Sequence, residues 1–328
     1  MLNKNQCEDK LYVPIVAFWT KIPSDIPMEK SIQQQIEKLK KKHNAIILAH
    51  NYQNPEIQDI ADFVGDSLDL SLKATKTDAK IIVFCGVDFM AESAKILNPE
   101  KTVILPDKTA NCPMAGMVDA ESLGWLKKEH PDAEVVAYIN TTADVKALAD
   151  ICCTSANGVK IVKSMTSKKI IFVPDRNLGL FIQKQVPEKE MILWPGVCRI
   201  HHDIKKEDVL DLKKKHPEAE FLAHPECQPE IIELADYAFS TNGMVDHVKT
   251  SPKTEFIIGT EKGLCYRLEK ENPGKKFYPI PSAVCPNMKK TTLEKVLKSM
   301  ETLEPKIHLS ETIMRKARLP LQRMIEMR

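Results

Sequence analysis

Glycine is scarce in this sequence, and its scarcity excludes the commonest nucleotide-binding sites. The chain of 328 residues contains 11 glycines, roughly half of what an ordinary usage of about 7% would give. Neither the G-x-G-x-x-G pattern of dinucleotide-binding folds nor the G-x-x-x-x-G-K-[ST] pattern of phosphate loops occurs. A protein that holds NAD or ATP in such glycine-rich loops is therefore excluded.

The sequence also lacks a strong charge of either sign and a long apolar run. The formal net charge is +2, which argues against a nucleic-acid partner because such a partner requires clustered basic residues. The apolar stretch near the start, residues 11–19, is far shorter than the roughly 20 residues that span a bilayer. It is not followed by a small-residue cleavage site. We therefore expect a cytoplasmic protein with no membrane partner.

Cysteine is plentiful, and its number bears on metal binding. The chain has nine cysteines, and both the reducing cytoplasm and the odd count argue against a disulfide framework. Some of these residues are expected in the core, where cysteine behaves as a small hydrophobic residue. Metal binding or catalysis remains open for the others.

The clearest positive feature is an internal repeat. Three amphipathic helical stretches end at His43, His130 and His216, which are 87 and 86 residues apart. Each stretch runs into a short apolar segment of the kind that forms buried parallel strands, and two further such segments follow in each repeat. The nine expected strands are residues 45–49, 81–84, 103–105, 135–137, 170–173, 191–194, 221–223, 256–258 and 277–280.

Strands that alternate with helices predict an α/β fold with parallel sheets. We expect three similar αβα units, arranged about a pseudo-three-fold axis with the active site at their junction, because units of this size bury little core alone. The expected boundaries are an N-terminal extension over 1–27, α/β domains over 28–117, 118–203 and 204–290, and C-terminal helices over 291–328 that pack back on the body.

Polar residues recur at matching positions after the first strand of each unit. An aspartate follows in each unit (Asp62, Asp150 and Asp236), and a hydroxyl comes five residues later (Ser67, Ser155 and Thr241). Ligands of parallel sheets bind at the carboxyl ends of the strands, and helix N-termini attract anions. The alternatives are that each hydroxyl is only a helix N-cap, and that the repeat reflects a duplication without functional convergence.

Three cysteines share the register of the repeat. Cys112, Cys198 and Cys285 each follow the third strand of a unit, and they are 86 and 87 residues apart. About a pseudo-three-fold axis their sulfurs would meet, as three ligands of a [4Fe–4S] cluster whose fourth iron stays open. A three-cysteine zinc site is the alternative, although structural zinc usually takes close C-x₂-C pairs. The other cysteines fall outside this register; Cys85 ends a strand, and Cys152 and Cys153 are expected to precede a helix.

At this point the sequence resembles a known family. The matching segments are Ala49–Gln53, Gly65–Leu68, Gly86–Glu92, Thr154–Asn157, Pro174–Gly179, His224–Cys227 and Cys285–Lys289. Together they are similar to the quinolinate synthase family, and the resemblance extends from about Ala45 to the C-terminus.

The resemblance implies the condensation of iminosuccinate with dihydroxyacetone phosphate to quinolinate, with release of phosphate and water. It also implies a [4Fe–4S] cluster held by the same three cysteines, and a transient contact with L-aspartate oxidase, the enzyme that would supply the imine. The substrate-binding positions that it implies are His50, Ser67, Tyr138, Asn140, Ser155, His201, His224, Glu226 and Thr241, with Tyr52 also in the pocket.

Within that set, His50, Tyr52, His224 and Glu226 are the expected acids and bases. We expect Glu226 to move protons on the triose and Tyr52 to act in late steps. Two other functions remain open on the residues alone: a zinc-dependent or metal-free enzyme acting on sugar phosphates, and a non-catalytic iron–sulfur sensor.

Overall fold

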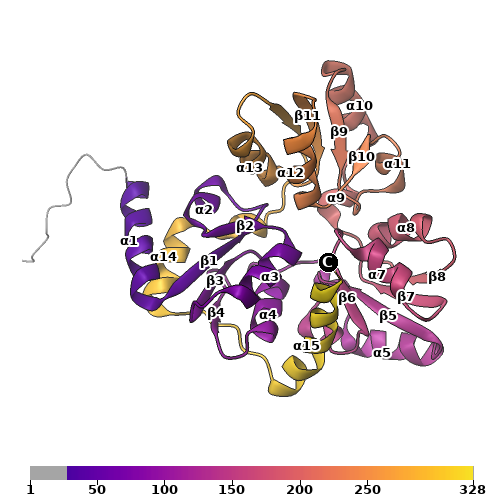
Figure 1. The fold of residues 1–328 in the computed structure, drawn as a ribbon, viewed down its shortest axis with the longest axis horizontal. Coiled ribbons are helices and arrows are strands. Elements are labelled where there is room, and N and C mark those ends of the chain that lie inside the picture. The colour runs from indigo at the N-terminus through magenta and orange to yellow at the C-terminus, as the bar shows by residue number, and fades with distance from the viewer. Residues whose placement is uncertain (1–27, 328) are drawn as a thin grey trace, which may run out of the picture.

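The computed structural model describes residues 28–327 and consists of three similar α/β units followed by two helices (Figure 1). The expected N-terminal extension, the apolar stretch over 11–19 and Cys7 lie outside the described residues. Each unit contains one four-stranded sheet in which all neighbouring strands are parallel. The α/β class and the three parallel sheets are therefore confirmed.

The elements of the three units follow one another in the same order. Unit 1 contains α1 (Met28–His43), β1 (Ala45–His50), α2 (Pro55–Ile60), β2 (Phe63–Gly65), α3 (Ser67–Lys76), β3 (Ile81–Cys85), α4 (Asp88–Leu97), β4 (Thr102–Ile104) and η1 (Ala115–Met117). Unit 2 contains α5 (Ala120–Glu129), β5 (Ala133–Tyr138), α6 (Ala143–Lys146), β6 (Ile151–Cys153), α7 (Gly158–Ser164), β7 (Lys169–Val173), α8 (Arg176–Gln185), β8 (Glu190–Leu193) and α9 (Arg199–His202). Unit 3 contains α10 (Lys206–Lys215), β9 (Glu220–Ala223), α11 (Pro229–Ile232), β10 (Tyr237–Ala238), α12 (Thr241–Thr250), β11 (Glu255–Gly259), α13 (Gly263–Glu271), β12 (Lys276–Pro279) and η2 (Met288–Lys290).

The three sheets have one topology. Their strand orders are β2-β1-β3-β4, β6-β5-β7-β8 and β10-β9-β11-β12. The nine expected strands are all present, with ends that differ by one or two residues. The short edge strands β2, β6 and β10 were not expected, because two or three residues are too few to give an apolar pattern. Cys152 and Cys153, which were expected to precede a helix, lie in β6 and are followed by α7.

The aspartate that recurs in each unit holds an edge of its sheet together. Asp62, Asp150 and Asp236 each accept a hydrogen bond from a backbone N–H of the central strand, at 2.8, 2.7 and 2.7 Å. The backbone N–H of each aspartate donates to the carbonyl of that same strand residue. This pair of bonds ties the start of the edge strand to its neighbour, so the repeated aspartate has a structural role.

Replacing Asp236 by alanine is therefore expected to lower stability. The substitution leaves the partly buried N–H of Phe221 without its acceptor, and an unsatisfied buried donor costs about 1–3 kcal/mol. The melting temperature of the variant should fall by several degrees. Asp236→Asn keeps an acceptor oxygen and is the matched control; a similar fall in both variants would contradict the assigned role.

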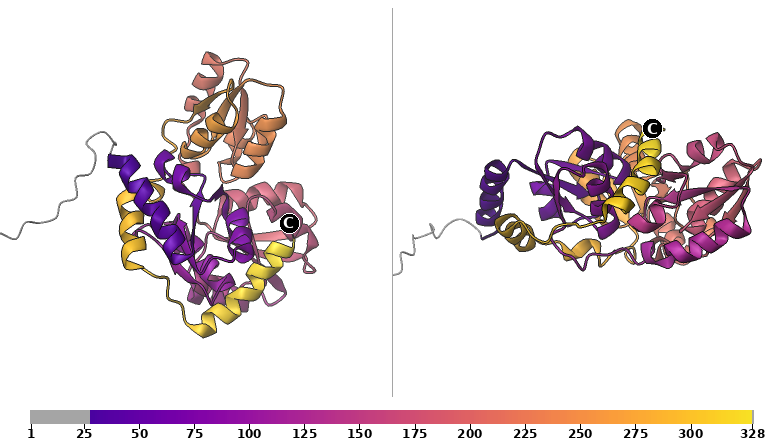
Figure 2. Two further views of the ribbon diagram at one scale, coloured as in Figure 1. Left: turned by 60° about the vertical axis from the view of Figure 1, so that its left-hand side comes forward. Right: turned by 90° about the horizontal axis from the view of Figure 1, so that it is seen from below.

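The two C-terminal helices pack on the body rather than forming a separate layer (Figure 2). Helix α14 (Leu293–Thr302) lies beside α1, and α15 (Glu311–Glu326) contacts α3 and α4 of unit 1 as well as α6 and β6 of unit 2. Two hydrogen bonds attach α15 to unit 2: the Arg323 guanidinium donates to the Asp150 carbonyl at 2.8 Å, and the Asn157 amide donates to the Met324 carbonyl at 3.2 Å. Helix α15 therefore bridges two of the units.

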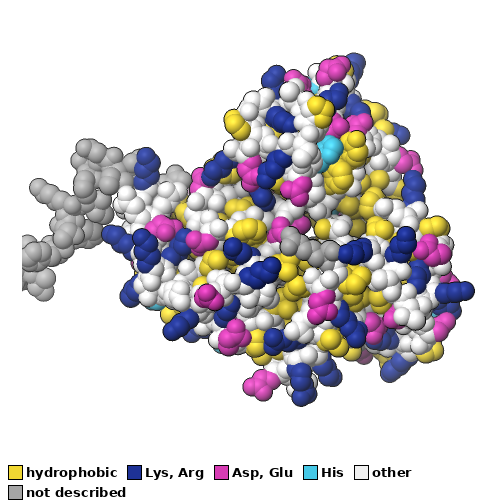
Figure 3. Space-filling model, viewed as in Figure 1, with side chains coloured by type: hydrophobic (Ala, Val, Ile, Leu, Met, Phe, Trp, Pro, Cys, Tyr) yellow, Lys and Arg dark blue, Asp and Glu magenta, His cyan; other side chains and the backbone are white. Residues whose placement is uncertain are grey.

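None of the described helices combines the length and the apolar character needed to cross a membrane. On the face shown in Figure 3, lysine and arginine side chains alternate with aspartate and glutamate over all three units. That face carries no large patch of one sign, as the small net charge of +2 suggests.

Candidate functional site

One cavity receives side chains from all three units. It has a volume of about 260 Å³, which suits a small molecule rather than a macromolecule. His50 and Tyr138 end the central strands β1 and β5, and His224 directly follows β9. The cavity is lined by every site residue expected from the sequence: His50, Tyr52, Ser67, Cys112, Tyr138, Asn140, Ser155, Cys198, His201, His224, Glu226, Thr241 and Cys285.

The three cysteines in register all reach this cavity as free thiols. Cys112, Cys198 and Cys285 are partly buried, and burial raises the pKa of the Cys112 thiol to about 12 and that of the other two as well. Such thiols become thiolates only when a bound cation displaces their protons. Burial raises the thiol pKa of Cys85 and Cys152 to about 12 as well, so the case for metal binding rests on three soft sulfur donors in one cavity rather than on their pKa.

The positions of these sulfurs can be compared with those around a single zinc ion. A tetrahedral zinc ion with bonds of about 2.3 Å brings its sulfur ligands within about 4 Å of one another. Among the described residues, the cysteine trio is not a group whose ligand atoms all lie within 4.8 Å. As placed, the three sulfurs therefore do not share one tetrahedral ion, and three thiols are donors that iron–sulfur clusters also take.

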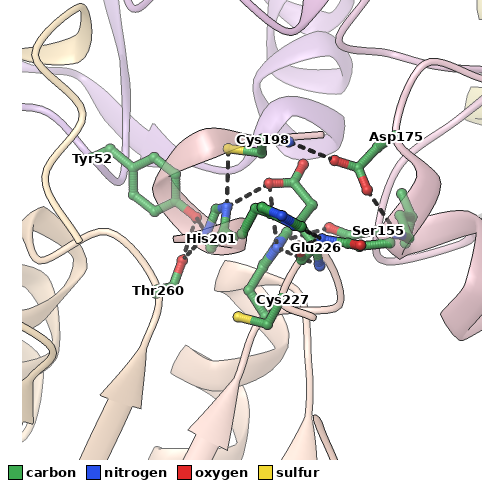
Figure 4. Close-up of polar contacts among 12 residues, drawn as sticks. Tyr52, Ser155, Asp175, Cys198, His201, Glu226, Cys227 and Thr260 are labelled. Atoms are coloured by element: carbon green, nitrogen blue, oxygen red, sulfur yellow. Dashed lines mark hydrogen bonds and ion pairs between the residues drawn. The ribbon is translucent and has the colours of Figure 1, made fainter. Parts of the chain in front are cut away.

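A tighter group lies beside one of the cysteines. Cys198, His201 and Glu226 have ligand atoms within 4.8 Å of one another, a mixed donor set that zinc accepts. However, His201 Nδ1 is 2.6 Å from Glu226 Oε2 and 3.2 Å from Cys198 Sγ. The first distance is that of a direct hydrogen bond, so the imidazole and the carboxylate bind each other in this geometry (Figure 4).

Two histidines that end equivalent strands are held in one tautomer. The backbone N–H of Tyr52 donates to His50 Nδ1 at 3.2 Å, and that of Glu226 donates to His224 Nδ1 at 3.4 Å. With Nδ1 as the acceptor, the proton of each neutral ring resides on Nε2. In His224 this nitrogen is 3.2 Å from Ser155 Oγ. Both rings therefore present an N–H donor on the side away from the backbone.

Burial keeps these two rings neutral, and this has a consequence for stability. It lowers the pKa of His50 and of His224 to about 3, whereas an imidazole in an unfolded chain has a pKa of about 6.5. Between about pH 6.5 and 3 the unfolded chain binds protons that the folded chain does not. Stability therefore falls as the pH drops through this window.

We expect the melting temperature to fall between pH 7 and pH 5, and to fall less steeply in His224→Asn. The asparagine oxygen can accept the same bond from the Glu226 N–H without titrating. The loss of ionised Glu226 begins only below its unfolded pKa near 4.5 and lies outside this range. Anaerobic thermal unfolding across a pH series measures the slope; a slope equal to that of the unsubstituted chain would contradict the assignment.

Glu226 is fully buried yet favours its charged form. Burial raises the pKa of its carboxyl group, but the adjacent His201, whose Nδ1 is 2.6 Å from Glu226 Oε2, opposes this effect and brings the pKa below its ordinary value. The Oδ1 atom of Asn140 is buried without a hydrogen-bond partner in the described part of the chain, whereas the Glu226 carboxyl also accepts a hydrogen bond from the Tyr138 side chain. Because a buried oxygen is costly to leave unpaired, Asn140 points to a donor on a bound ligand.

The recurring hydroxyls are not helix caps. Asp66 and Ser240 cap α3 and α12, where their side chains accept N–H bonds from the first turn. Ser67 and Thr241 are instead the first residues of these helices. The N-cap alternative was therefore wrong for both, and each residue lines the cavity at the start of its helix.

One residue of the site was missed from the sequence. Thr260 is fully buried, and its Oγ1 is 2.5 Å from the Tyr52 hydroxyl and 2.8 Å from His201 Nε2. It joins Tyr52 to the His201–Glu226 pair, as Figure 4 shows. Its counterparts in the other units carry no hydroxyl, so comparison of the repeats gives no signal for it.

Fold and cavity together define a class: an α/β protein of three units that directs thiols, imidazoles and a buried carboxylate into one small-molecule site. The family model described as Quinolinate synthetase A protein matches residues 34–326. The chain belongs to the quinolinate synthase family, a family of enzymes.

Curated relatives agree over nearly their whole length. The chain is 56% identical over 293 residues to quinolinate synthase of Thermodesulfovibrio yellowstonii, covering 89% of this chain and 97% of the relative. It is 53% identical over 299 residues to quinolinate synthase of Caldicellulosiruptor saccharolyticus, with 91% and 99% covered. It is 53% identical over 293 residues to quinolinate synthase of Methanosarcina barkeri, with 89% and 96% covered.

Proposed function

We propose that this chain condenses iminosuccinate with dihydroxyacetone phosphate to give quinolinate, phosphate and water, in NAD biosynthesis. The observation that supports this most is that the cysteine trio and all the polar site residues line the same small cavity. Family membership supports this reaction, and the cavity supplies groups that suit it. In this proposal the three units surround a pseudo-three-fold axis, and their junction is the active site.

Cys112, Cys198 and Cys285 would hold a [4Fe–4S] cluster, each unit supplying one ligand. When bound, such a cluster supplies an iron without a protein ligand, which acts as a Lewis acid toward substrate oxygen. The proposed domain boundaries, 28–117, 118–203 and 204–290, place one of these cysteines in each domain.

Substrate binding would use the polar groups that remain. Ser67 and Thr241 begin helices of ten residues, whose dipole favours the carboxylates or the phosphate. Asn140, with its unpartnered buried oxygen, and Tyr138 are placed to bind the other polar groups of the substrates.

Proton transfer would fall to the buried network. Glu226 favours the carboxylate form, so it can accept a proton from the triose. Tyr52 has a pKa raised well above 10 by burial, so its hydroxyl stays protonated and can donate in later dehydrations. His50 and His224 are neutral and offer Nε2–H donors to developing negative charge.

The proposal is tested with protein purified without oxygen. Iron, sulfide and zinc are counted, and quinolinate formation from the two substrates is measured. The expected sample is brown, bleaches in air and makes quinolinate. A colourless sample with one zinc per chain would instead favour a sugar-phosphate enzyme, and a brown sample without quinolinate formation would favour a sensor. A transient contact with L-aspartate oxidase, which would deliver the unstable imine, stays a prediction.

A further inference from the structure

A carboxylate accompanies each of the three cysteines in register. Asp88, Asp175 and Glu261 are 87 and 86 residues apart, the same spacing as the cysteines. Each lies just beyond β3, β7 or β11, at or directly before the start of α4, α8 or α13. The carboxylates thus repeat with the thiols, although the two sets lie 23 or 24 residues apart in sequence.

Each carboxylate accepts the backbone N–H of its cysteine. The N–H of Cys112 donates to Asp88 Oδ1 at 3.2 Å. The N–H of Cys198 donates to Asp175 Oδ2 at 3.0 Å, as Figure 4 shows. The N–H of Cys285 donates to Glu261 Oε1 at 3.2 Å. The same bond therefore occurs at all three cysteines.

A second bond fixes each cysteine loop from the other side. The carbonyl two residues before each cysteine, at Ala110, Gly196 and Ala283, accepts a backbone N–H from the start of the same helix, at 2.9, 2.7 and 2.9 Å. The loop is thus held on both sides of the peptide that leads to the thiol.

The carboxylates are themselves fixed. Asp175 and Glu261 are fully buried, and each directs its other oxygen to a helix N–H, from Leu178 or Gly263, at 2.7 Å. Lys289 adds an ion pair to Glu261 at 3.0 Å. A side chain with both oxygens engaged cannot rotate, so it holds the cysteine amide in one direction.

We propose that Asp88, Asp175 and Glu261 are positioning residues that hold the three cysteine loops in the geometry the metal centre requires. This inference rests on the proposed cluster. Three thiolates near one another repel, and they are kept in place only if the backbone that carries them is fixed beforehand. The carboxylates do not touch the metal; they act through the cysteine amides.

The three carboxylates differ in how many of their oxygens accept N–H bonds. Amide substitutions are therefore expected to differ in their effect. In Asp175 and Glu261 both oxygens accept N–H bonds. The side-chain amide of Asn or Gln would place its NH₂ group, which cannot accept a hydrogen bond, opposite one of these N–H donors. In Asp88 one oxygen accepts both the Phe89 and the Cys112 N–H, so an amide can keep both bonds. Asp175→Asn and Glu261→Gln should therefore be harmful, and Asp88→Asn should be tolerated.

The experiment measures the rate at which a chelator removes iron from the anaerobically purified holoprotein. Loss of an outer-shell partner of a metal site costs about 10–100-fold in affinity. We expect release to be at least about tenfold faster in Asp175→Asn and Glu261→Gln. It should stay within about twofold of the unsubstituted chain in Asp88→Asn. Asp150→Asn, a carboxylate of unit 2 that accepts a strand N–H far from the cysteine loops, is the matched control and should also stay within twofold.

Asp88→Ala gives a second route if a buried variant does not fold. It removes the acceptor that Asp88→Asn keeps, and it should release iron faster than Asp88→Asn. Equal release rates in all variants would overturn the inference while leaving the cluster itself in place. An equal acceleration in Asp150→Asn, or melting temperatures that fall in step with the release rates, would overturn it too. An unsubstituted chain that holds no iron–sulfur cluster would overturn both this inference and the proposed function.

Discussion

Serine in place of Cys112, Cys198 or Cys285 is expected to abolish both the brown colour and quinolinate formation. A hydroxyl is a hard and far less acidic ligand than a thiol, so iron loses one of its three anchors. Because even loss of an outer-shell partner costs about 10–100-fold, the rate should drop by more than about a hundredfold. Iron and sulfide counts on anaerobic protein, together with the quinolinate assay, measure both effects.

Cys85→Ser is the matched control. Cys85 is fully buried at the end of β3, and it lies outside the lining of the cavity. The variant should keep its iron and its activity. If Cys85→Ser bleaches the protein while Cys112→Ser does not, the ligand assignment is wrong.

Glu226→Gln should reduce the rate of quinolinate formation by about 10²–10⁴-fold, the usual contribution of a general base. The amide has nearly the same shape but cannot accept a proton from the substrate. Iron content should be unchanged, because Glu226 is not among the proposed ligands. Steady-state rates and iron counts on the same preparation separate the two effects.

Glu220→Gln controls for loss of a carboxylate–imidazole pair. Glu220 lies in the same unit and its Oε2 is 2.6 Å from His247 Nε2, but this pair lies outside the cavity lining. Its substitution should change the rate by less than about twofold. If Glu226→Gln kept the full rate, the base would have to be another group; if it lost iron in parallel, Glu226 would act on the metal centre instead.

The repeat explains why so much of the site could be predicted. Several site residues recur at equivalent positions of the three repeats. The cysteine trio and the trio of Ser67, Ser155 and Thr241 can therefore be recognised from the sequence alone. Continuous apolar runs such as 81–84 predicted the buried strands in the same way. What these predictions share is a signal carried by residues close together in one unit or repeated in all three.

Most of the features that were missed lack such a signal. The edge strands β2, β6 and β10 are short and are fixed by tertiary bonds from the repeated aspartates rather than by their own sequence. Thr260 gains its place from Tyr52, a residue 208 positions away. The carboxylates Asp88, Asp175 and Glu261 did have a signal in their spacing, but their meaning depends on which amide each one meets.

The distribution of the three thiols over three sheets has a consequence for biogenesis. If Cys112, Cys198 and Cys285 are the ligands, no unit can hold the cofactor alone, because each unit contributes a single cysteine. A nascent chain of which only the first two units have left the ribosome carries two of the three proposed cysteine ligands. Delivery of iron and sulfide must then wait until translation has passed Cys285 and the last unit has docked, which makes maturation a step that follows synthesis.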